Sequence, residues 1–328
     1  MRFHILTAQD VRAALPMRDA IDAMRKAFGL LAGGEVDMPQ RTAIEIPKHD
    51  AVTLVMPAYV HVGNRLGAKL VSVFPNNRGL DLPTIHAVVI LLNAATGQPA
   101  ALLEGTALTA IRTGAASGLA TDLLARRDAS TLAILGSGAQ ARTQLEAVCC
   151  VRSIERVFVY SRTRAHAEQF AADMAGKNGA PASIEVSASA QEACLAADVV
   201  CAATSSTTPV LYATDVRPGT HINAIGSYTP AMREIDSELV RGSTVFVDQR
   251  QAALAEAGEV IDCVEDGSLT ESDLTELGEV VNGARPGRKT VEQITLFKSV
   301  GLAVQDVAAA QQALTAALQR KLGAVVNL

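Results

Sequence analysis

The sequence predicts an α/β fold in which a doubly wound parallel sheet is joined to a second, discontinuous α+β domain. One observation is the apolar run Thr131–Leu135, which leads into Gly136-x-Gly138-x-x-Ala141 and then into a helical pattern. Strand, tight turn and helix in this order are typical of a Rossmann-type dinucleotide-binding unit. The other is a regular alternation of strand and helix patterns after the turn, which predicts a parallel sheet.

The composition indicates a globular protein. The chain has 328 residues, 49% of them hydrophobic and 19% charged, which allows two domains with separate cores. The net charge of −5, without a basic block, argues against a nucleic-acid partner. No apolar run could span a bilayer, and residues 1–4 lead into a helical pattern without a signal-peptide core, so no membrane association is expected. Five cysteines without C-x-x-C spacing fit the cytoplasm, and no metal site is expected.

The first third of the chain combines helices with short strands. Thr7 and Asp10 mark the start of one helix, Pro16 opens a second, and Gly33-Gly34 ends it. Four β-like runs follow that are close enough to pair as hairpins: 52–59, 66–74, 85–93 and 100–105. Residues 107–126 are expected to form the helix that leads to the glycine-rich turn.

After the turn, strands are predicted at 157–161, 183–186, 198–203, 221–226 and 244–248, with helices at 164–175 and 190–196. A last long helix over 302–322 stops at Gly323 and is expected to pack on the N-terminal domain. The predicted domains are therefore residues 1–118 with 302–328, which form the discontinuous domain, and residues 119–301, which form the dinucleotide-binding domain.

The turn itself explains how a dinucleotide would bind. Gly136 permits the tight turn, Gly138 lets a pyrophosphate approach the backbone, and the small Ala141 allows the helix to pack closely on the strand. The helix start supplies unpaired N–H groups and the positive end of a dipole.

The end of the second strand indicates which dinucleotide. An acidic residue at this place binds the 2′-hydroxyl of NAD, whereas a basic one accommodates the 2′-phosphate of NADP. Here the strand ends in Ser161-Arg162-Thr163, followed by Arg164, without a carboxylate. We expect NADPH as the cofactor and NADH as the second choice; the alternative is a solvated helix start with arginines there by chance.

Three cations stand out because their surroundings are apolar or small. Lys69 lies in the strand-like run 66–74, Arg112 in the small-residue helix, and Arg41 on a loop after Pro39-Gln40. A buried lysine suits proton donation, and a guanidinium can hold a carboxylate with two hydrogen bonds. Each could instead be a structural ion pair or a surface side chain. Together they predict an anionic substrate.

Over nearly its whole length the chain resembles the ornithine cyclodeaminase/mu-crystallin family. The resemblance is carried by these motifs: Pro39-Gln40-Arg41, Gly67-Ala68-Lys69-Leu70-Val71, Leu82-Pro83-Thr84-Ile85-His86, Ala110-Ile111-Arg112-Thr113-Gly114-Ala115-Ala116, Gly136-Ser137-Gly138-Ala139-Gln140, His221-Ile222-Asn223-Ala224-Ile225-Gly226 and Thr295-Leu296-Phe297-Lys298-Ser299-Val300-Gly301.

The resemblance implies a homodimer built through the N-terminal domain and an active site in the interdomain cleft. It implies that Arg41, Lys69 and Arg112 surround the substrate carboxylate, with Tyr228 and Val300 also near the substrate. Lys69 would be the catalytic residue. With the turn and strand end above, the implied cofactor-binding residues are Thr84, Arg112, Thr113, Gly136, Ser137, Gly138, Ala139, Gln140, Ser161, Arg162, Thr163, Thr204, Ala224, Ile225, Gly226 and Ser299.

One departure from the family pattern bears on the reaction. Family members that cyclise ornithine, and the related alanine dehydrogenases, carry an Asp shortly after the Asn-Ala-(Ile/Val)-Gly strand, and here the matching place is Tyr228. A phenol, with a reference pKa near 10, is a poor substitute for a carboxylate base at neutral pH. The chain is therefore similar to the branch with mu-crystallin and the bacterial cyclic-ketimine reductases.

The expected activity is NADPH-dependent reduction of cyclic ketimino acids, Δ1-pyrroline-2-carboxylate to L-proline and, as a second substrate, Δ1-piperideine-2-carboxylate to L-pipecolate. The alternatives are an ornithine cyclodeaminase, which is a lyase, an oxidoreductase of the alanine dehydrogenase kind, and a crystallin-like binding protein without catalysis.

Overall fold

The computed structural model describes residues 2–80 and 82–327 and divides into two compact units. Unit 1 comprises Met1–Arg112 and Leu302–Leu328, and unit 2 comprises Thr113–Gly301. The domain boundary predicted from the sequence is residue 118, which lies later in the same helix. The small-residue pattern of that helix has no break at residue 112 that would mark the boundary there. None of the helices in the described ranges has the length and hydropathy needed to cross a membrane.

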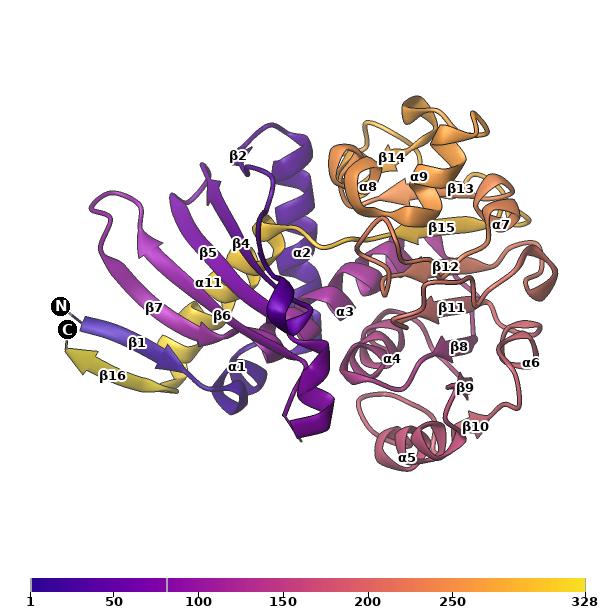
Figure 1. The fold of residues 1–328 in the computed structure, drawn as a ribbon, viewed down its shortest axis with the longest axis horizontal. Helices are drawn as coiled ribbons and strands as arrows, with labels where there is room; N and C mark the ends of the chain where they lie inside the picture. The colour runs from indigo at the N-terminus through magenta and orange to yellow at the C-terminus, as the bar shows by residue number, and fades with distance from the viewer. Residues whose placement is uncertain (1, 81, 328) are drawn as a thin grey trace. The chain divides into compact units, whose positions relative to one another are not determined.

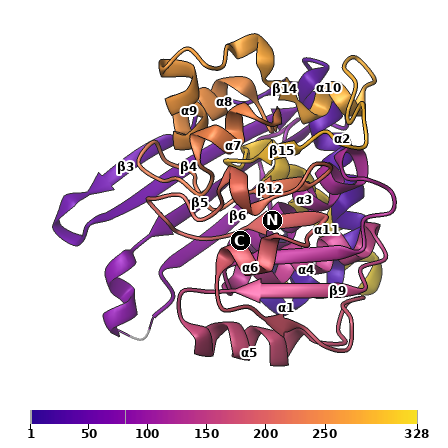
Figure 2. The same ribbon diagram turned by 90° about the vertical axis from the view of Figure 1, so that its right-hand side faces the viewer.

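Unit 1 is a sheet with helices on one face (Figure 1). Its strand order is β16-β1-β7-β6-β5-β4-β2, and β3 also pairs with β4. The elements are β1 (Arg2–Leu6), α1 (Ala8–Ala14), α2 (Met17–Ala32), β2 (Val36–Asp37), β3 (Thr42–Ile46), η1 (Pro47–His49), β4 (Ala51–Val60), β5 (Arg65–Val73), η2 (Pro75–Leu80), β6 (Ile85–Asn93), β7 (Pro99–Glu104), the first part of α3 (Gly105–Leu124), α11 (Ala303–Arg320) and β16 (Ala324–Asn327). Strands β3 to β7 pair antiparallel, and the long hairpin strands β3, β4 and β5 lie side by side (Figure 2).

Two strands at one side of the sheet of unit 1, β1 and β16, differ from the sequence prediction. Residues 2–4, expected to lead into a helix, lie in β1, which pairs parallel with β7 and antiparallel with β16. The short run alternates polar Arg2 and His4 with Phe3 and Ile5, which is a strand pattern too short to stand out. The first helix does begin after Thr7, whose side chain forms a capping box with Asp10.

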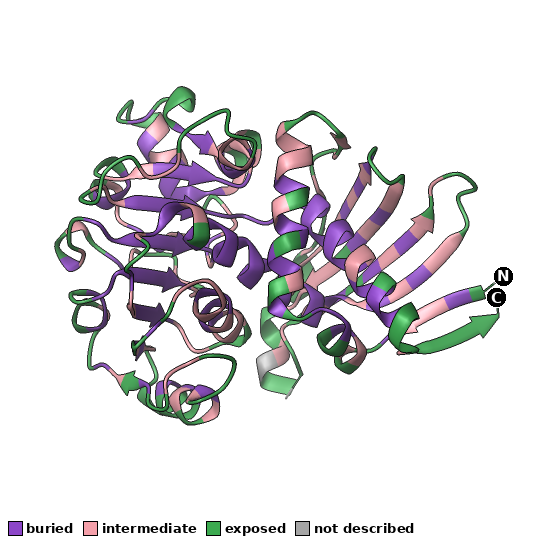
Figure 3. Ribbon diagram, turned by 180° about the vertical axis from the view of Figure 1, so that it is seen from behind, coloured by how far each residue is buried: buried purple, intermediate pink, exposed green. Residues whose placement is uncertain are grey.

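Helix α11 packs against strands β4, β5 and β6 and against α2. Gly67 allows this close approach, because a Cβ there would lie 2.7 Å from the Ile90 carbonyl oxygen and 3.2 Å from Val307 of α11. Alternate residues of β5 therefore face α11, and buried and partly exposed positions alternate along these strands (Figure 3). Leu70 and its cross-strand partner Val88 lie on the opposite face and are 45% and 40% exposed.

Unit 2 is an all-parallel sheet of eight strands in the order β10-β9-β8-β11-β12-β15-β13-β14. Its elements after α3 are β8 (Thr131–Leu135), α4 (Ala139–Val151), β9 (Arg156–Tyr160), α5 (Arg164–Met174), β10 (Glu185–Val186), α6 (Ala190–Cys194), β11 (Val199–Ala202), η3 (Ala213–Asp215), β12 (His221–Ala224), α7 (Ser237–Arg241), β13 (Thr244–Val247), α8 (Arg250–Glu256), α9 (Gly258–Glu265), η4 (Glu271–Asp273), β14 (Thr275–Glu276), α10 (Leu277–Val281) and β15 (Thr295–Lys298). The predicted fold class is confirmed.

Both faces of this sheet are covered by helices. Leu132 and Ile134 of β8 pack with residues of α4 and α5, whereas Ala133 and Leu135 pack with residues of α6 to α9. The central strands β11, β12 and β15 are consequently buried along their length, in contrast to the strands of unit 1 (Figure 3). The chain forms β8, β9 and β10 on one side and then crosses to β11, so the direction of winding changes at β8, which is where doubly wound sheets bind ligands.

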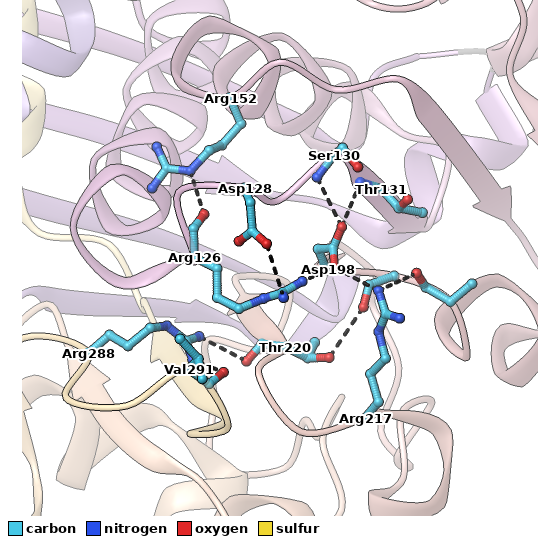
Figure 4. Close-up of polar contacts among 12 residues, drawn as sticks. Arg126, Asp128, Ser130, Thr131, Arg152, Asp198, Arg217, Thr220, Arg288 and Val291 are labelled. Atoms are coloured by element: carbon cyan, nitrogen blue, oxygen red, sulfur yellow. Dashed lines mark hydrogen bonds and ion pairs between the residues drawn. The ribbon is translucent and has the colours of Figure 1, made fainter.

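Arginine side chains hold the last turn of α3 and the residues after it. Arg152 donates hydrogen bonds to the carbonyl oxygens of Thr121 and of Arg126, just past the helix, both at 2.9 Å, and Figure 4 shows the contact with Arg126. Arg288 donates to the Leu124 carbonyl oxygen at 2.6 Å. The last four carbonyl groups of a helix lack intrahelical partners and carry the negative end of its dipole, so guanidinium groups satisfy both their hydrogen bonding and their charge. Arg126 in turn pairs with Asp198, at the amino end of β11.

Candidate functional site

The glycine-rich turn of unit 2 has the geometry that dinucleotide binding needs. Gly136 has φ +112°, and a Cβ on it would lie 2.5 Å from the carbonyl oxygen of Ala203. A Cβ on Gly138, the N-cap of α4, would meet no heavy atom within 4 Å, and no side chain caps this helix. The Oε1 atom of Gln140, in the first turn, is buried and has no hydrogen-bond partner among the described residues. An uncapped helix start and an open glycine fit a bound pyrophosphate, and the Gln140 oxygen could accept a hydrogen bond from a donor elsewhere on a dinucleotide, such as a ribose hydroxyl.

The end of β9 lies beside this turn. The hydroxyl of Ser137 donates a hydrogen bond to that of Ser161 at 3.1 Å. Arg162 and Thr163 follow and are exposed, and Thr163 forms no side-chain cap on α5. Arg164 pairs with Glu168 on the same helix at 2.8 Å, so of the two arginines Arg162 is the better placed for a phosphate.

The buried carboxylate of Glu234 ties the ends of β11 and β12 together. It accepts hydrogen bonds from the backbone N–H groups of Thr204 and Gly226, both at 2.6 Å, and of Ser227 at 3.2 Å. A Cβ on Gly226 would lie 2.1 Å from the Thr204 carbonyl oxygen and 2.5 Å from Glu234, so only glycine fits. Burial raises the pKa of Glu234, and Lys298 opposes that rise. Glu234 was not predicted from the sequence as a residue of the site.

Two further buried charges hold Ser227. Its hydroxyl donates to Glu259 at 2.7 Å, and its carbonyl oxygen accepts from the Lys298 ammonium at 2.6 Å. Lys298 also forms an ion pair with Glu259 at 3.0 Å, and both side chains are fully buried. Ser227, which immediately precedes Tyr228, is therefore fixed through its backbone N–H, its carbonyl oxygen and its hydroxyl group. Tyr228 itself is half-buried.

Asp248, at the end of β13, holds the turn that follows β15. One carboxylate oxygen accepts hydrogen bonds from the Ser299 hydroxyl at 3.0 Å and from the N–H groups of Val300 and Gly301 at 2.9 and 2.8 Å. Burial raises the pKa of Asp248, and these hydrogen bonds act against the rise. Ser299 and Val300 are thus held in one conformation, with the Ser299 N–H bonded to Ala224 of β12 at 3.1 Å.

Unit 1 contains a cluster of buried charges, which we call the cation cluster: Lys69, Arg112 and Asp306. The Lys69 ammonium lies 2.7 Å from Oδ2 of Asp306, and Arg112 Nε lies 2.9 Å from Oδ1 of the same carboxylate. Arg112 Nη1 donates to the side-chain oxygen of Gln305 at 2.8 Å. A guanidinium has five N–H groups, and these two contacts use two of them. Three N–H groups of Arg112 are therefore left for a ligand. The Nε2 atom of Gln305 is buried without a partner in the described ranges.

Burial and charge both act on this cluster. The pKa of Lys69 is lowered to about 8, mainly by burial. Arg112 and Arg41 also lower this pKa, whereas the negative charge of Asp306 raises it. Burial alone would raise the pKa of Asp306, but Lys69 and Arg112 outweigh it and the net pKa is lowered. The carboxylate is therefore ionised at neutral pH, and Lys69 can exchange its proton near that pH.

The other predicted residues lie as follows. Arg41 lies between β2 and β3 and is half-buried, and its charge acts on Lys69. Thr84 precedes β6, where its carbonyl oxygen accepts from the Phe74 N–H at 2.8 Å. Thr113 is 6% exposed in α3. Ile225 is buried after β12, with its N–H bonded to Ala202 at 3.0 Å, and Ala139 begins α4. The roles assigned to these residues from the sequence stay predictions.

Known proteins resemble the chain over its whole length. A Δ1-pyrroline-2-carboxylate reductase of Bacillus cereus is 39% identical over 321 residues, which is 97% of this chain and 98% of the relative. The structure of Thermococcus litoralis Δ1-pyrroline-2-carboxylate reductase in complex with NADH and L-proline superimposes with a TM-score of 0.94, at 41% identity over 99% of this chain and 100% of the other. An archaeal alanine dehydrogenase dimer with bound NAD gives a TM-score of 0.92, at 36% identity over 100% of both chains.

The fold, the dinucleotide-type turn and these relatives define an NAD(P)H-dependent oxidoreductase that acts on carbon–nitrogen bonds. The family model described as ornithine cyclodeaminase/mu-crystallin family matches residues 1–321. The chain belongs to that family, and the resemblance drawn from its motifs is confirmed.

Proposed function

We propose that the protein reduces cyclic ketimino acids with NADPH, converting Δ1-pyrroline-2-carboxylate to L-proline and Δ1-piperideine-2-carboxylate to L-pipecolate. The observation that carries the proposal is the cation cluster, in which a buried lysine and a buried arginine share one carboxylate. It is supported by relatives that are named reductases of pyrroline-2-carboxylate, one of them bound to L-proline.

In this proposal the residues of unit 1 bind and protonate the substrate. The remaining N–H groups of Arg112 hold the substrate carboxylate, and the charge of Arg41 assists. The Lys69 ammonium donates its proton to the imine nitrogen and is protonated again from solvent. A bound reduced nicotinamide supplies the hydride for the imine carbon. The imine, a hydride and a proton together give the secondary amine, so atoms and charge balance.

Oxidation of NADPH, followed by its absorbance, tests the activity. The substrates to compare are Δ1-pyrroline-2-carboxylate, Δ1-piperideine-2-carboxylate, and pyruvate with ammonia. We expect turnover with the two cyclic imines and little with pyruvate and ammonia. Faster turnover of pyruvate with ammonia would instead favour an alanine dehydrogenase. This alternative is considered because one similar structure is an archaeal alanine dehydrogenase.

Replacing Arg162 by aspartate is expected to raise the Michaelis constant for NADPH about ten- to a hundredfold, because a charged hydrogen bond contributes roughly 1.5–3 kcal/mol. The constant for NADH should change much less, since NADH has no 2′-phosphate. The matched control is Arg156→Asp, at the other end of β9, where an exposed arginine pairs with Glu185. Equal constants for NADPH and NADH in the parent enzyme would contradict the choice of NADPH.

Ornithine is expected to give no ammonia at a useful rate, because Tyr228 stands where the family's cyclodeaminases place a carboxylate. Reduction of a preformed imine needs no base to remove an amine, so it should proceed. Ammonia release from ornithine with catalytic NAD, measured without added imine, would overturn this assignment. Tyr228→Phe then separates two roles: a small effect on imine reduction indicates a lining residue, and about a hundredfold loss indicates a proton donor.

We also propose that two copies associate through unit 1 to form a homodimer. The sheet face that α11 leaves open carries exposed apolar side chains, among them Leu70 and its cross-strand partner Val88. Such a face is typical of an interface, and an archaeal relative is described as a dimer. We propose a location in the cytoplasm, which the five cysteines without C-x-x-C spacing predict.

A further inference from the structure

Asp306 of α11 is a fully buried carboxylate whose two oxygens contact two different cations, Lys69 of β5 and Arg112 of α3. We propose that Asp306 is a positioning residue: it holds the Lys69 ammonium and the Arg112 guanidinium so that one can donate a proton while the other binds the substrate carboxylate. The inference rests on the proposed function, in which these two side chains have those roles.

The backbone around Asp306 makes this arrangement rigid. Asp306 lies in the first turn of α11, where the helix dipole favours a negative charge. The preceding residue, Gln305, accepts hydrogen bonds through one oxygen from Arg112 Nη1 at 2.8 Å and from the Leu302 N–H at 2.9 Å. Because Gly67 lets α11 approach β5, Lys69, two residues along the same strand, reaches Asp306 directly. The helix start and both cations are thus fixed together.

The charges also balance in a way that fits the substrate. One carboxylate between two cations leaves the cation cluster with a net charge of +1, to which Arg41 adds a further positive charge, and this excess attracts a substrate with a carboxylate. Without Asp306 two buried cations would face each other unpaired, which is strongly unfavourable. The charged groups that act on Lys69 are Asp306, Arg112 and Arg41. Its neighbours on β4 and β6 are Met56 and Val89, which carry no charge.

Asp306→Asn is the direct test, since it keeps the shape and one acceptor oxygen but removes the charge. Burial already lowers the pKa of Lys69 to about 8, and Asp306 is the group that raises it. In the variant, the alkaline limb of the pH profile of kcat/KM should therefore move to lower pH by about one unit or more. Asp306→Glu, which restores the charge, should return the limb to its place. A residue with a purely structural role would lower the amount of active enzyme and leave the limb where it is.

A second measurement does not depend on turnover. In protein labelled with ¹³C at the lysine ε-carbons, the Lys69 resonance is assigned by its loss in Lys69→Met, and its titration midpoint is read directly. We expect a midpoint near 8 in the parent protein and a lower one in Asp306→Asn. If Asp306→Asn does not fold, Asp306→Glu should keep the parent midpoint while its KM rises, and a lower midpoint in Asp306→Glu would overturn the inference.

The two readouts separate the inference from the proposed function. If the parent reduces cyclic imines and both the limb and the midpoint are unchanged in Asp306→Asn, the positioning role is wrong and the function stands. If the midpoint falls as expected but the parent reduces no cyclic imine, the proposed function fails while the coupling of Asp306 to Lys69 stands, and the roles assigned to the two cations are wrong.

Discussion

Replacing Lys69 by methionine is expected to lower kcat/KM for reduction of Δ1-pyrroline-2-carboxylate by about a hundred- to ten-thousandfold, the usual contribution of a positioned general acid. Lys69 is 2% exposed and lies 2.7 Å from Asp306, so solvent cannot easily take over its proton. Methionine has nearly the same length and removes only the ammonium. Asp306 keeps its contact with Arg112 at 2.9 Å, so unit 1 should still fold.

Steady-state rates and NADPH affinity are the measurements. The affinity, followed by the fluorescence of bound NADPH, should not change, because Lys69 is no part of the glycine-rich turn. Lys26→Met, an exposed position on α2, is the control and should behave like the parent. If Lys69→Met keeps a kcat/KM within about threefold of the parent, the proton comes from another group and Tyr228 becomes the first candidate.

The cation cluster could be predicted in part from the sequence. Lys69 and Arg112 were identified because each is a single charge among apolar or small residues. Asp306 was not predicted, although the same signal is present: it lies in the run 302–310, where Gln305 is the only other polar residue. What this signal cannot supply is the pairing, because residues 69, 112 and 306 meet only through packing of α11 on the sheet.

Most strands of the parallel sheet could be predicted from the sequence, whereas β15 of that sheet and the strands β1 and β16 of unit 1 could not. Strands such as β8 and β11 are covered on both faces and read as continuous apolar runs between helices. β15 was not predicted as a strand, although it lies between β12 and β13, because it has four residues and ends in a lysine. β1 and β16 pair with each other from opposite ends of the chain, which no local pattern indicates.

Replacing Lys298 by methionine is expected to lower the free energy of unfolding by about 3–5 kcal/mol, the range for removing one partner of a buried ion pair. Lys298 is fully buried, and its ammonium pairs with Glu259 at 3.0 Å and opposes the raised pKa of Glu234. Without the ammonium, both carboxylates stay buried and lose the cation that acts on them in the parent. Urea unfolding followed by circular dichroism measures the loss as a lower midpoint.

The loss of stability in Lys298→Met should also depend on pH. Burial already raises the folded-state pKa of Glu234, and in Lys298→Met it rises further because the opposing ammonium is gone. Above the unfolded value of about 4.3 the folded variant therefore binds more protons than the unfolded state, until pH exceeds the raised pKa. Stability of the variant relative to the parent should therefore fall as pH rises through this range, and the difference should be smaller near pH 5 than near pH 8. Lys289→Met, at an exposed position of unit 2, should stay within about 0.5 kcal/mol of the parent at both. A Lys298→Met protein as stable as Lys289→Met at both pH values would show that the buried ammonium does not stabilise the fold, and it would contradict the prediction.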